Sequence, residues 1–164
     1  MLFRSNITVS TVGIVPGMRR LADFPLPVTL AVSLHAPDDE LRNELVPVNR
    51  RYPIDAVVEA AREYVARKGR RVTFEYACID RVNDQVLRAE ALAALLRGFP
   101  GGAHVNLIPL NATGGFGGTP PDRVRLEAFA GALGDRGVNA TIRRNRGTDI
   151  DAACGQLRAR TLGG

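Results

Sequence analysis

The sequence predicts an α/β fold in which one parallel sheet of about five strands is covered by helices. Two observations predict it: short β-rich runs alternate with helical segments along the chain, and one of these runs is apolar at nearly every position, as in a strand buried on both faces of a parallel sheet. The length of 164 residues, 45% of them hydrophobic and 24% charged, suits one folded core. A closed eight-stranded barrel needs roughly 250 residues, so we expect an open or incomplete barrel, or a small doubly wound sheet.

The first elements expected along the chain are two strands, each followed by a short helix. Residues 6–13 (NITVSTVG) form a β-rich run that ends in glycine, and a helical turn can follow over residues 16–22. Residues 28–36 (VTLAVSLHA) are apolar at nearly every position, which is typical of a strand buried on both faces of a parallel sheet. Residues 38–45 begin with three acidic side chains, which suit the first turn of a helix.

The clearest helix spans residues 53–68, because its first turn contains a proline, one face is apolar and Gly69 marks its end. The same pattern then repeats. Further strands are expected at residues 71–79, 104–110 and 139–144, and further helices at residues 86–97 and 122–133. Strands and helices at this spacing predict right-handed βαβ units.

Charge and composition exclude several classes of function. The net charge of +5 favours a polyanionic partner, and Lys68 is the only lysine among the 22 basic residues. The chain therefore has no phosphate-loop lysine, and GGFGG at residues 114–118 does not complete a dinucleotide motif. Two cysteines and two histidines without metal-ligand spacing argue against a metal site formed by this chain alone. We expect a cytoplasmic protein with no membrane span, because long apolar segments are absent.

Polar residues follow the expected strands at the edge where parallel α/β proteins bind their ligands. Each can also be explained without a ligand, as a turn former, a helix cap or a buried hydrogen-bonded group. Their convergence at one edge is what indicates a binding site. They are Ser10, Thr11, Ser33, His35, Asp80, Asn83, Asp84 and Asn111.

The two cysteines differ in their surroundings. Cys78 lies within an apolar strand and is expected to be inert core. Cys154 follows the last strand among small residues, where a thiol is either a nucleophile with a lowered pKa or a structural residue.

The segment around Cys154, RGTDIDAACGQL at residues 146–157, resembles the C-terminal motif of the RlmN/Cfr family of radical S-adenosylmethionine methyltransferases. Four further segments resemble blocks of the same family, in the family's order. They are ITVSTVGIVPGMRRLAD, VTLAVSLHAPDDELRNELVPVNRRYPI, RVTFEYACIDRVND and HVNLIPLN. The resemblance implies a partial parallel (β/α) barrel of the radical S-adenosylmethionine type.

The resemblance also implies roles for individual residues. Ser10, the Ser33-Leu34-His35 segment and Asn111 match the family's adenosylmethionine contacts, and Cys154 matches its methyl-carrying catalytic cysteine. The implied activity is methylation of carbon 2 of adenine in 23S rRNA and tRNA, with carbon 8, the position used by the Cfr branch, as the alternative. The implied cofactors are adenosylmethionine and a [4Fe-4S] cluster, reduced by an electron donor such as flavodoxin.

The sequence departs from the family at the cluster, because the CxxxCxxC motif that holds it is absent from these 164 residues. We therefore expect the C-terminal half of such an enzyme, truncated at its N-terminus and inactive alone. Residues 1–147 would form the partial barrel, and residues 148–164 a segment that carries the catalytic cysteine.

Two other functions remain open from the residues. One is an RNA-binding module without catalysis, with contacts from Arg50 and Arg51, from the cluster at residues 67–71, and from Arg143, Arg144 and Arg146. The other is an inert relic whose unpaired strand edge promotes association.

Overall fold

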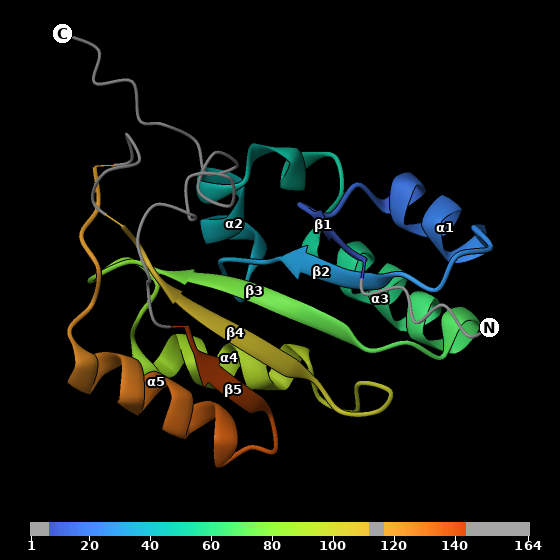
Figure 1. Ribbon diagram of the computed structural model, residues 1–164. Coiled ribbons are helices and arrows are strands. Elements are labelled where there is room, and N and C mark those ends of the chain that lie inside the picture. Colours follow the sequence, from blue (N-terminus) through green and yellow to red (C-terminus); the bar gives the residue numbers. More distant parts are fainter. Residues whose placement is uncertain (1–6, 112–116, 144–164) are drawn as a thin grey trace, which may run out of the picture.

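The computed structural model describes residues 7–111 and 117–143 (Figure 1). Within these ranges the chain alternates between strands and helices, as the sequence predicts. The strands are β1 (Thr8–Thr11), β2 (Thr29–Ser33), β3 (Val72–Cys78), β4 (His104–Pro109) and β5 (Asn139–Ile142). The helices are α1 (Val15–Asp23), α2 (Asp39–Leu45), the 3₁₀ helix η1 (Pro47–Arg50), α3 (Ile54–Lys68), α4 (Val86–Leu95) and α5 (Arg123–Gly134).

The five strands form one sheet in the order β1-β2-β3-β4-β5, and every neighbouring pair is parallel. Spatial order equals chain order, so right-handed crossovers bring the connecting helices to the same face of the sheet. In Figure 1 the sheet lies in front of α3 and α4. This is the arrangement of part of a barrel, and it confirms the predicted α/β fold with five parallel strands.

The main core lies between the sheet and these helices. Alternate side chains of the strands, such as Phe74 and Tyr76 of β3, point into it and are completely buried. The Phe74 ring meets the Phe99 ring edge to face, with 5.1 Å between their centroids. A second apolar cluster joins α2 to the carboxyl ends of the strands through Leu41, Leu45 and their neighbours. The remaining side chains of the strands face the side of the sheet opposite α3 and α4, where α2 packs against the carboxyl ends of the strands.

The structure adds two features that the sequence pattern did not predict. The 3₁₀ helix η1 lies between α2 and α3, and β2 ends at Ser33, whereas the apolar run continues to Ala36. Within the described ranges, no helix has the length and apolar character needed to cross a membrane. The expected segment at residues 148–164, with Cys154, lies outside the described residues.

Candidate functional site

The residues predicted to bind adenosylmethionine lie on neighbouring strands, in or just after the carboxyl ends. Ser10 is in β1 and exposed, Ser33 is the last residue of β2 and 6% exposed, and Asn111 follows the end of β4 by two residues. In the sheet register Ser10 is aligned with Ala31 of β2, which lies two residues before Ser33. These three predicted residues are therefore brought to the same edge of the sheet. Cys154 belongs to the part of the chain that is not described.

Leu34 differs from its neighbours because its side chain is fully buried in the main core. Its backbone N–H donates to the carbonyl of Glu75 at 2.9 Å, and its carbonyl accepts from Nε of Arg42 at 3.0 Å. The Leu34 side chain therefore anchors the segment in the main core.

His35 is held in an unusual conformation. Its φ of 61° lies in the left-handed region, and it is 2% exposed. Its Nδ1 accepts the backbone N–H of Ala77 at 2.9 Å, so the proton of the neutral ring is on Nε2. Burial, reinforced by the nearby positive charge of Arg42, lowers the pKa of His35 to about 3. At neutral pH the ring is therefore an uncharged donor at Nε2, where it has no partner among the described residues.

Asn83 holds His35 and β3 together. Its Nδ2 donates to the carbonyls of His35 (2.8 Å) and Ala77 (2.7 Å), and its Oδ1 accepts from the N–H of Ile79 at 2.7 Å. The Tyr76 hydroxyl donates to the carbonyl of Asn83 at 2.8 Å. The sequence singled out Asn83 as a polar strand-end residue, and its observed role is to position the histidine.

Arg42 is the buried centre of this edge, with no exposed surface. Its guanidinium donates to the carbonyls of Val12 (2.7 Å), Ser33 (2.8 Å) and Leu34 (3.0 Å), and to Oδ1 of Asn49 at 2.7 Å. Burial lowers the pKa of Arg42 to about 10, so it remains charged at neutral pH. One side chain from α2 therefore fixes the ends of β1 and β2.

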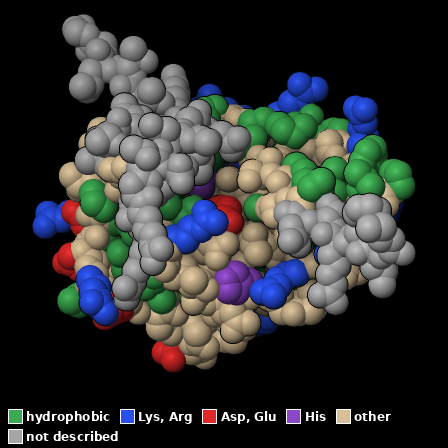
Figure 2. Space-filling view, in the orientation of Figure 1, with side chains coloured by type: hydrophobic (Ala, Val, Ile, Leu, Met, Phe, Trp, Pro, Cys, Tyr) green, Lys and Arg blue, Asp and Glu red, His purple; other side chains and the backbone are tan. Residues whose placement is uncertain are grey.

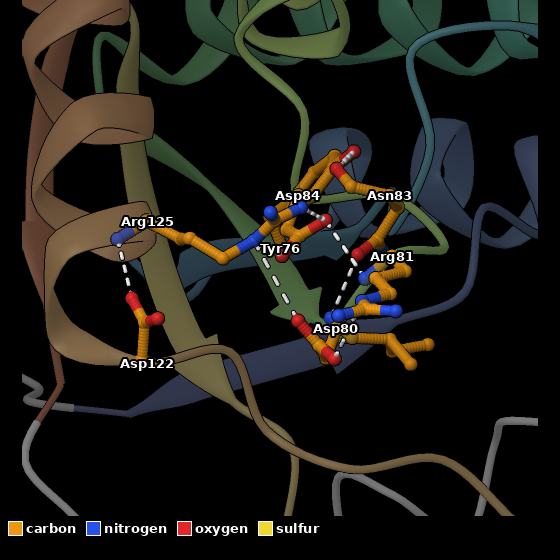
Figure 3. Close-up of polar contacts among 8 residues, drawn as sticks. Tyr76, Asp80, Arg81, Asn83, Asp84, Asp122 and Arg125 are labelled. Carbon is orange, nitrogen blue, oxygen red and sulfur yellow. Dashed lines mark hydrogen bonds and ion pairs between the residues drawn. The ribbon is translucent and has the colours of Figure 1, made fainter.

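An ion-pair cluster joins the segment that follows β3 to α5, as Figure 3 shows. Arg125 donates from Nε (2.6 Å) and Nη2 (2.8 Å) to the two carboxylate oxygens of Asp84, whose side chain is 1% exposed. Hydrogen bonding to Asp84 raises the pKa of Arg125 above its ordinary value. The N–H of Asp80 donates to the carbonyl of Thr119 at 2.8 Å. Thr119, in the segment before α5, is thus fastened beside the end of β3.

The described residues fit adenosylmethionine but not an iron-sulfur cluster. Serine hydroxyls and the unpartnered His35 Nε2–H are groups that can hydrogen-bond a polar ligand. Cys78 is buried in the core, and burial raises its pKa to about 12, so it does not supply the thiolate that a cluster needs. Within residues 7–111 and 117–143, no cluster of histidine, cysteine or acidic side chains could hold a metal ion.

Sequence reasoning missed Arg42 and Arg125, since charged side chains are expected at the surface. One signal was available for Arg42, because it lies next to Leu41 and three residues before Leu45, on the apolar side of a short helix. The pairing of Arg125 with Asp84 had no sequence signal, because the two residues are 41 positions apart.

Comparison with known proteins identifies relatives of the chain. No protein-family model matches it. It is 59% identical over 158 residues to the probable dual-specificity RNA methyltransferase RlmN of Frankia alni, which covers 96% of this chain and 37% of that protein. It is 60% identical over 154 residues to the protein of the same name from a Parafrankia strain, covering 94% and 40%. The chain thus spans about two fifths of the length of these curated relatives.

Solved structures agree with these relatives. A radical SAM methyltransferase from Sphaerobacter thermophilus superposes with a TM-score of 0.84 at 57% identity, over 93% of this chain and 44% of that one. A domain of a pyruvate-formate lyase-activating enzyme from Bacteroides vulgatus superposes with a TM-score of 0.65 at 18% identity, which shows a shared fold alone. The predicted resemblance and the radical SAM type of fold are confirmed.

Replacement of Arg42 by methionine is expected to destabilise the protein strongly. The variant leaves three backbone carbonyls and the Asn49 side chain without their buried donor, so the free energy of unfolding should fall by at least about 3 kcal/mol in urea titrations. Arg62→Met is the matched control, because Arg62 also donates to two carbonyls but at the surface, and should cost about 1 kcal/mol. Equal losses in the two variants would contradict the central role of Arg42.

The buried neutral His35 predicts a specific pH dependence of stability. The unfolded chain binds a proton on this ring near pH 6.5, whereas the folded chain binds it only near pH 3. His35 therefore favours the folded state fully above pH 6.5, and this contribution is lost as the pH falls toward 3, by at most about 1.4 kcal/mol per pH unit.

The test compares the wild type with His35→Asn, since asparagine tolerates the left-handed backbone and its Oδ1 can still accept from the Ala77 N–H. The carboxylates titrate in both proteins, so their effect cancels in the difference between the two free energies of unfolding. The advantage of the wild type over the variant should shrink between pH 6.5 and 4, and a difference that is independent of pH would refute a neutral buried ring.

Proposed function

We propose that this chain, which is homologous to one segment of the RlmN radical SAM methyltransferases, supplies the adenosylmethionine site of an enzyme that methylates carbon 2 of adenine in 23S rRNA and tRNA. The name of the relatives, dual-specificity RNA methyltransferase, supports this assignment. The observation that carries the proposal is the convergence of Ser10, Ser33, His35 and Asn111 at one edge of a parallel sheet, which is where such sheets bind ligands. An enzyme of this kind works in the cytoplasm.

The chemistry of these residues is recognition rather than reaction. His35 would donate from Nε2, and the hydroxyls of Ser10 and Ser33 and the amide of Asn111 would orient the ligand. Because the ring of His35 stays neutral, it adds a directed hydrogen bond without adding positive charge beside a cationic sulfonium. Cys154 would accept a methyl group on its sulfur and present it to the adenine ring, as the resemblance implies.

The remaining parts of the enzyme would come from outside this chain. The [4Fe-4S] cluster supplies reducing power when bound, and its cysteine ligands would belong to the part of the longer protein that these 164 residues do not include. An electron donor such as flavodoxin would serve that complete enzyme. We expect the 164-residue chain alone to bind adenosylmethionine without cleaving it.

The surface arginines form two groups, one near the carboxyl ends of the strands and one near their amino ends. Their positions bear on where RNA would bind. Arg50 and Arg51 precede α3 and Arg143 follows β5, so all three lie toward the carboxyl ends of the strands with the proposed site. The cluster at residues 67–71 lies at the opposite edge, where Arg67 pairs with Asp23 at 2.9 Å. RNA phosphates would therefore meet the first group.

A titration with S-adenosylhomocysteine, followed by amide NMR shifts, tests the proposed cofactor site. The amides of Ser33, His35 and Asn111 are expected to shift, while Gly69 and Gly102, at the opposite edge, should not. Ser33→Ala should weaken binding about tenfold, because one hydrogen bond to the ligand is lost. Shifts confined to the opposite edge, or none up to millimolar ligand, would refute the proposal.

The RNA surface is tested with paired charge-neutralising variants. Arg50→Gln/Arg51→Gln should weaken binding of an adenine-containing stem-loop RNA and reduce the slope of log affinity against log salt by about 1 to 2. Arg70→Gln/Arg71→Gln removes the same charge at the other edge and should leave the slope unchanged. If only Arg70→Gln/Arg71→Gln lowered the slope, the RNA surface would lie at the amino ends of the strands, away from the proposed cofactor site.

A further inference from the structure

The face of the sheet opposite α3 and α4 carries a row of polar side chains that extends beyond the proposed contacts. Figure 2 views the molecule in the orientation of Figure 1, and charged groups and histidine are visible in the middle of this face. Glu75 points to this face because its neighbours Phe74 and Tyr76 point into the main core. The strand register aligns one residue from each of four strands at a single level. They are Ser33, Glu75, Asn106 and Thr141.

A chain of hydrogen bonds fixes Glu75 from one side. Nδ2 of Asn106 donates to Oε1 of Glu75 at 2.9 Å, and Oδ1 of Asn106 lies 3.1 Å from Nε2 of His104. Oγ1 of Thr141 is also 3.1 Å from that nitrogen. An ionised carboxylate only accepts, so the Asn106 amide must turn its NH₂ group toward Glu75 and its oxygen toward His104. The orientation of the Glu75 carboxylate is therefore set by residues of β4 and β5.

The other oxygen of the same carboxylate is unused. Oε2 of Glu75 is buried and has no hydrogen-bond partner among the described residues. A buried carboxylate oxygen without a donor is unfavourable, and buried polar atoms in folded proteins nearly always have one. The side chain is thus held firmly in place with one acceptor open, which is the arrangement expected of a binding group before its ligand arrives.

We propose that Glu75 is a further binding residue for adenosylmethionine, with Oε2 accepting a hydrogen bond from a ribose hydroxyl or from the ammonium group of the ligand. This inference rests on the proposed function. Glu75 is the register partner of Ser33 on the neighbouring strand, and adjacent strands are about 4.8 Å apart, so a ligand at Ser33 is within reach. His35 is bonded to Ala77, two residues along β3 from Glu75. An open donor, His35 Nε2–H, and an open acceptor therefore flank the same part of the sheet.

The test measures binding of two ligands by NMR titration of the 164-residue chain. S-adenosylhomocysteine contains both the ribose hydroxyls and the ammonium group, whereas 5′-methylthioadenosine contains only the hydroxyls. Glu75→Gln keeps the size of the side chain and its bond from Asn106, but it can place an NH₂ group where Oε2 stood. We expect the variant to bind S-adenosylhomocysteine about tenfold to a hundredfold more weakly. An equal loss for methylthioadenosine assigns the hydroxyls, and a loss for S-adenosylhomocysteine alone assigns the ammonium group.

Two controls separate a binding role from a structural one. Glu127→Gln removes the same charge from an exposed position on α5, where Glu127 pairs with Arg123, and should leave the affinity unchanged with at most a small fall in melting temperature. In the wild type, the side-chain carboxylate carbon resonance of Glu75 should shift on addition of S-adenosylhomocysteine, and that of Glu127 should not, a readout that needs no variant.

The outcomes are distinguishable. Unchanged affinity of Glu75→Gln, with or without a lower melting temperature, would overturn the role of Glu75 and leave the proposed function intact. A wild-type chain that binds neither ligand would overturn both. The inference would also be overturned if the wild-type chain binds S-adenosylhomocysteine but the side-chain carboxylate carbon resonance of Glu75 does not shift.

Discussion

The rest of the site depends on how the backbone carbonyls at the ends of β1 and β2 are satisfied. A parallel strand that ends inside a protein leaves carbonyls that need donors, and here one guanidinium supplies them to Val12, Ser33 and Leu34. The same group holds Asn49, whose Nδ2 donates to Oδ1 of Asp39 at 2.8 Å. That carboxylate oxygen also accepts from the first N–H of α3, at Ile54. Arg42 therefore links the edge of the sheet to the start of the next helix, which is a strong reason for burying a charge.

This rigidity is what allows His35 to keep a left-handed backbone. A non-glycine residue in that region is strained. Such strain persists only when several surrounding contacts hold the residue in the same conformation. Here Arg42 binds the preceding carbonyl, Asn83 binds the carbonyl of His35 itself, and Ala77 donates to the ring. The consequence is an imidazole whose tautomer and direction are both fixed. A ligand that meets it does not have to order it, which lowers the entropic cost of binding.

Much of this architecture could be predicted from the sequence, and the exceptions have physical causes. The helix at residues 53–68 and the buried strand at residues 28–36 follow from periodicity and apolar content, and the edge residues from their positions after strands. The position of Arg42 on the apolar side of α2 is a signal that it is buried, but the sequence could not show which carbonyls its guanidinium binds, because they lie 8 to 30 positions away in the chain. Nor could it show that Arg125 pairs with Asp84, since the two residues are 41 positions apart in the chain.

The two faces of β3 explain why the described residues include an oriented polar group but no reactive thiolate. Tyr76 and Cys78 share the face that packs under the helices, so the thiol is dry and its pKa is about 12. Glu75, on the opposite face, is held by Asn106 and keeps one oxygen open. Alternation along a single strand thus separates an inert core from a polar face. A ligand that reached that face would meet polar groups whose directions are already fixed by neighbouring strands.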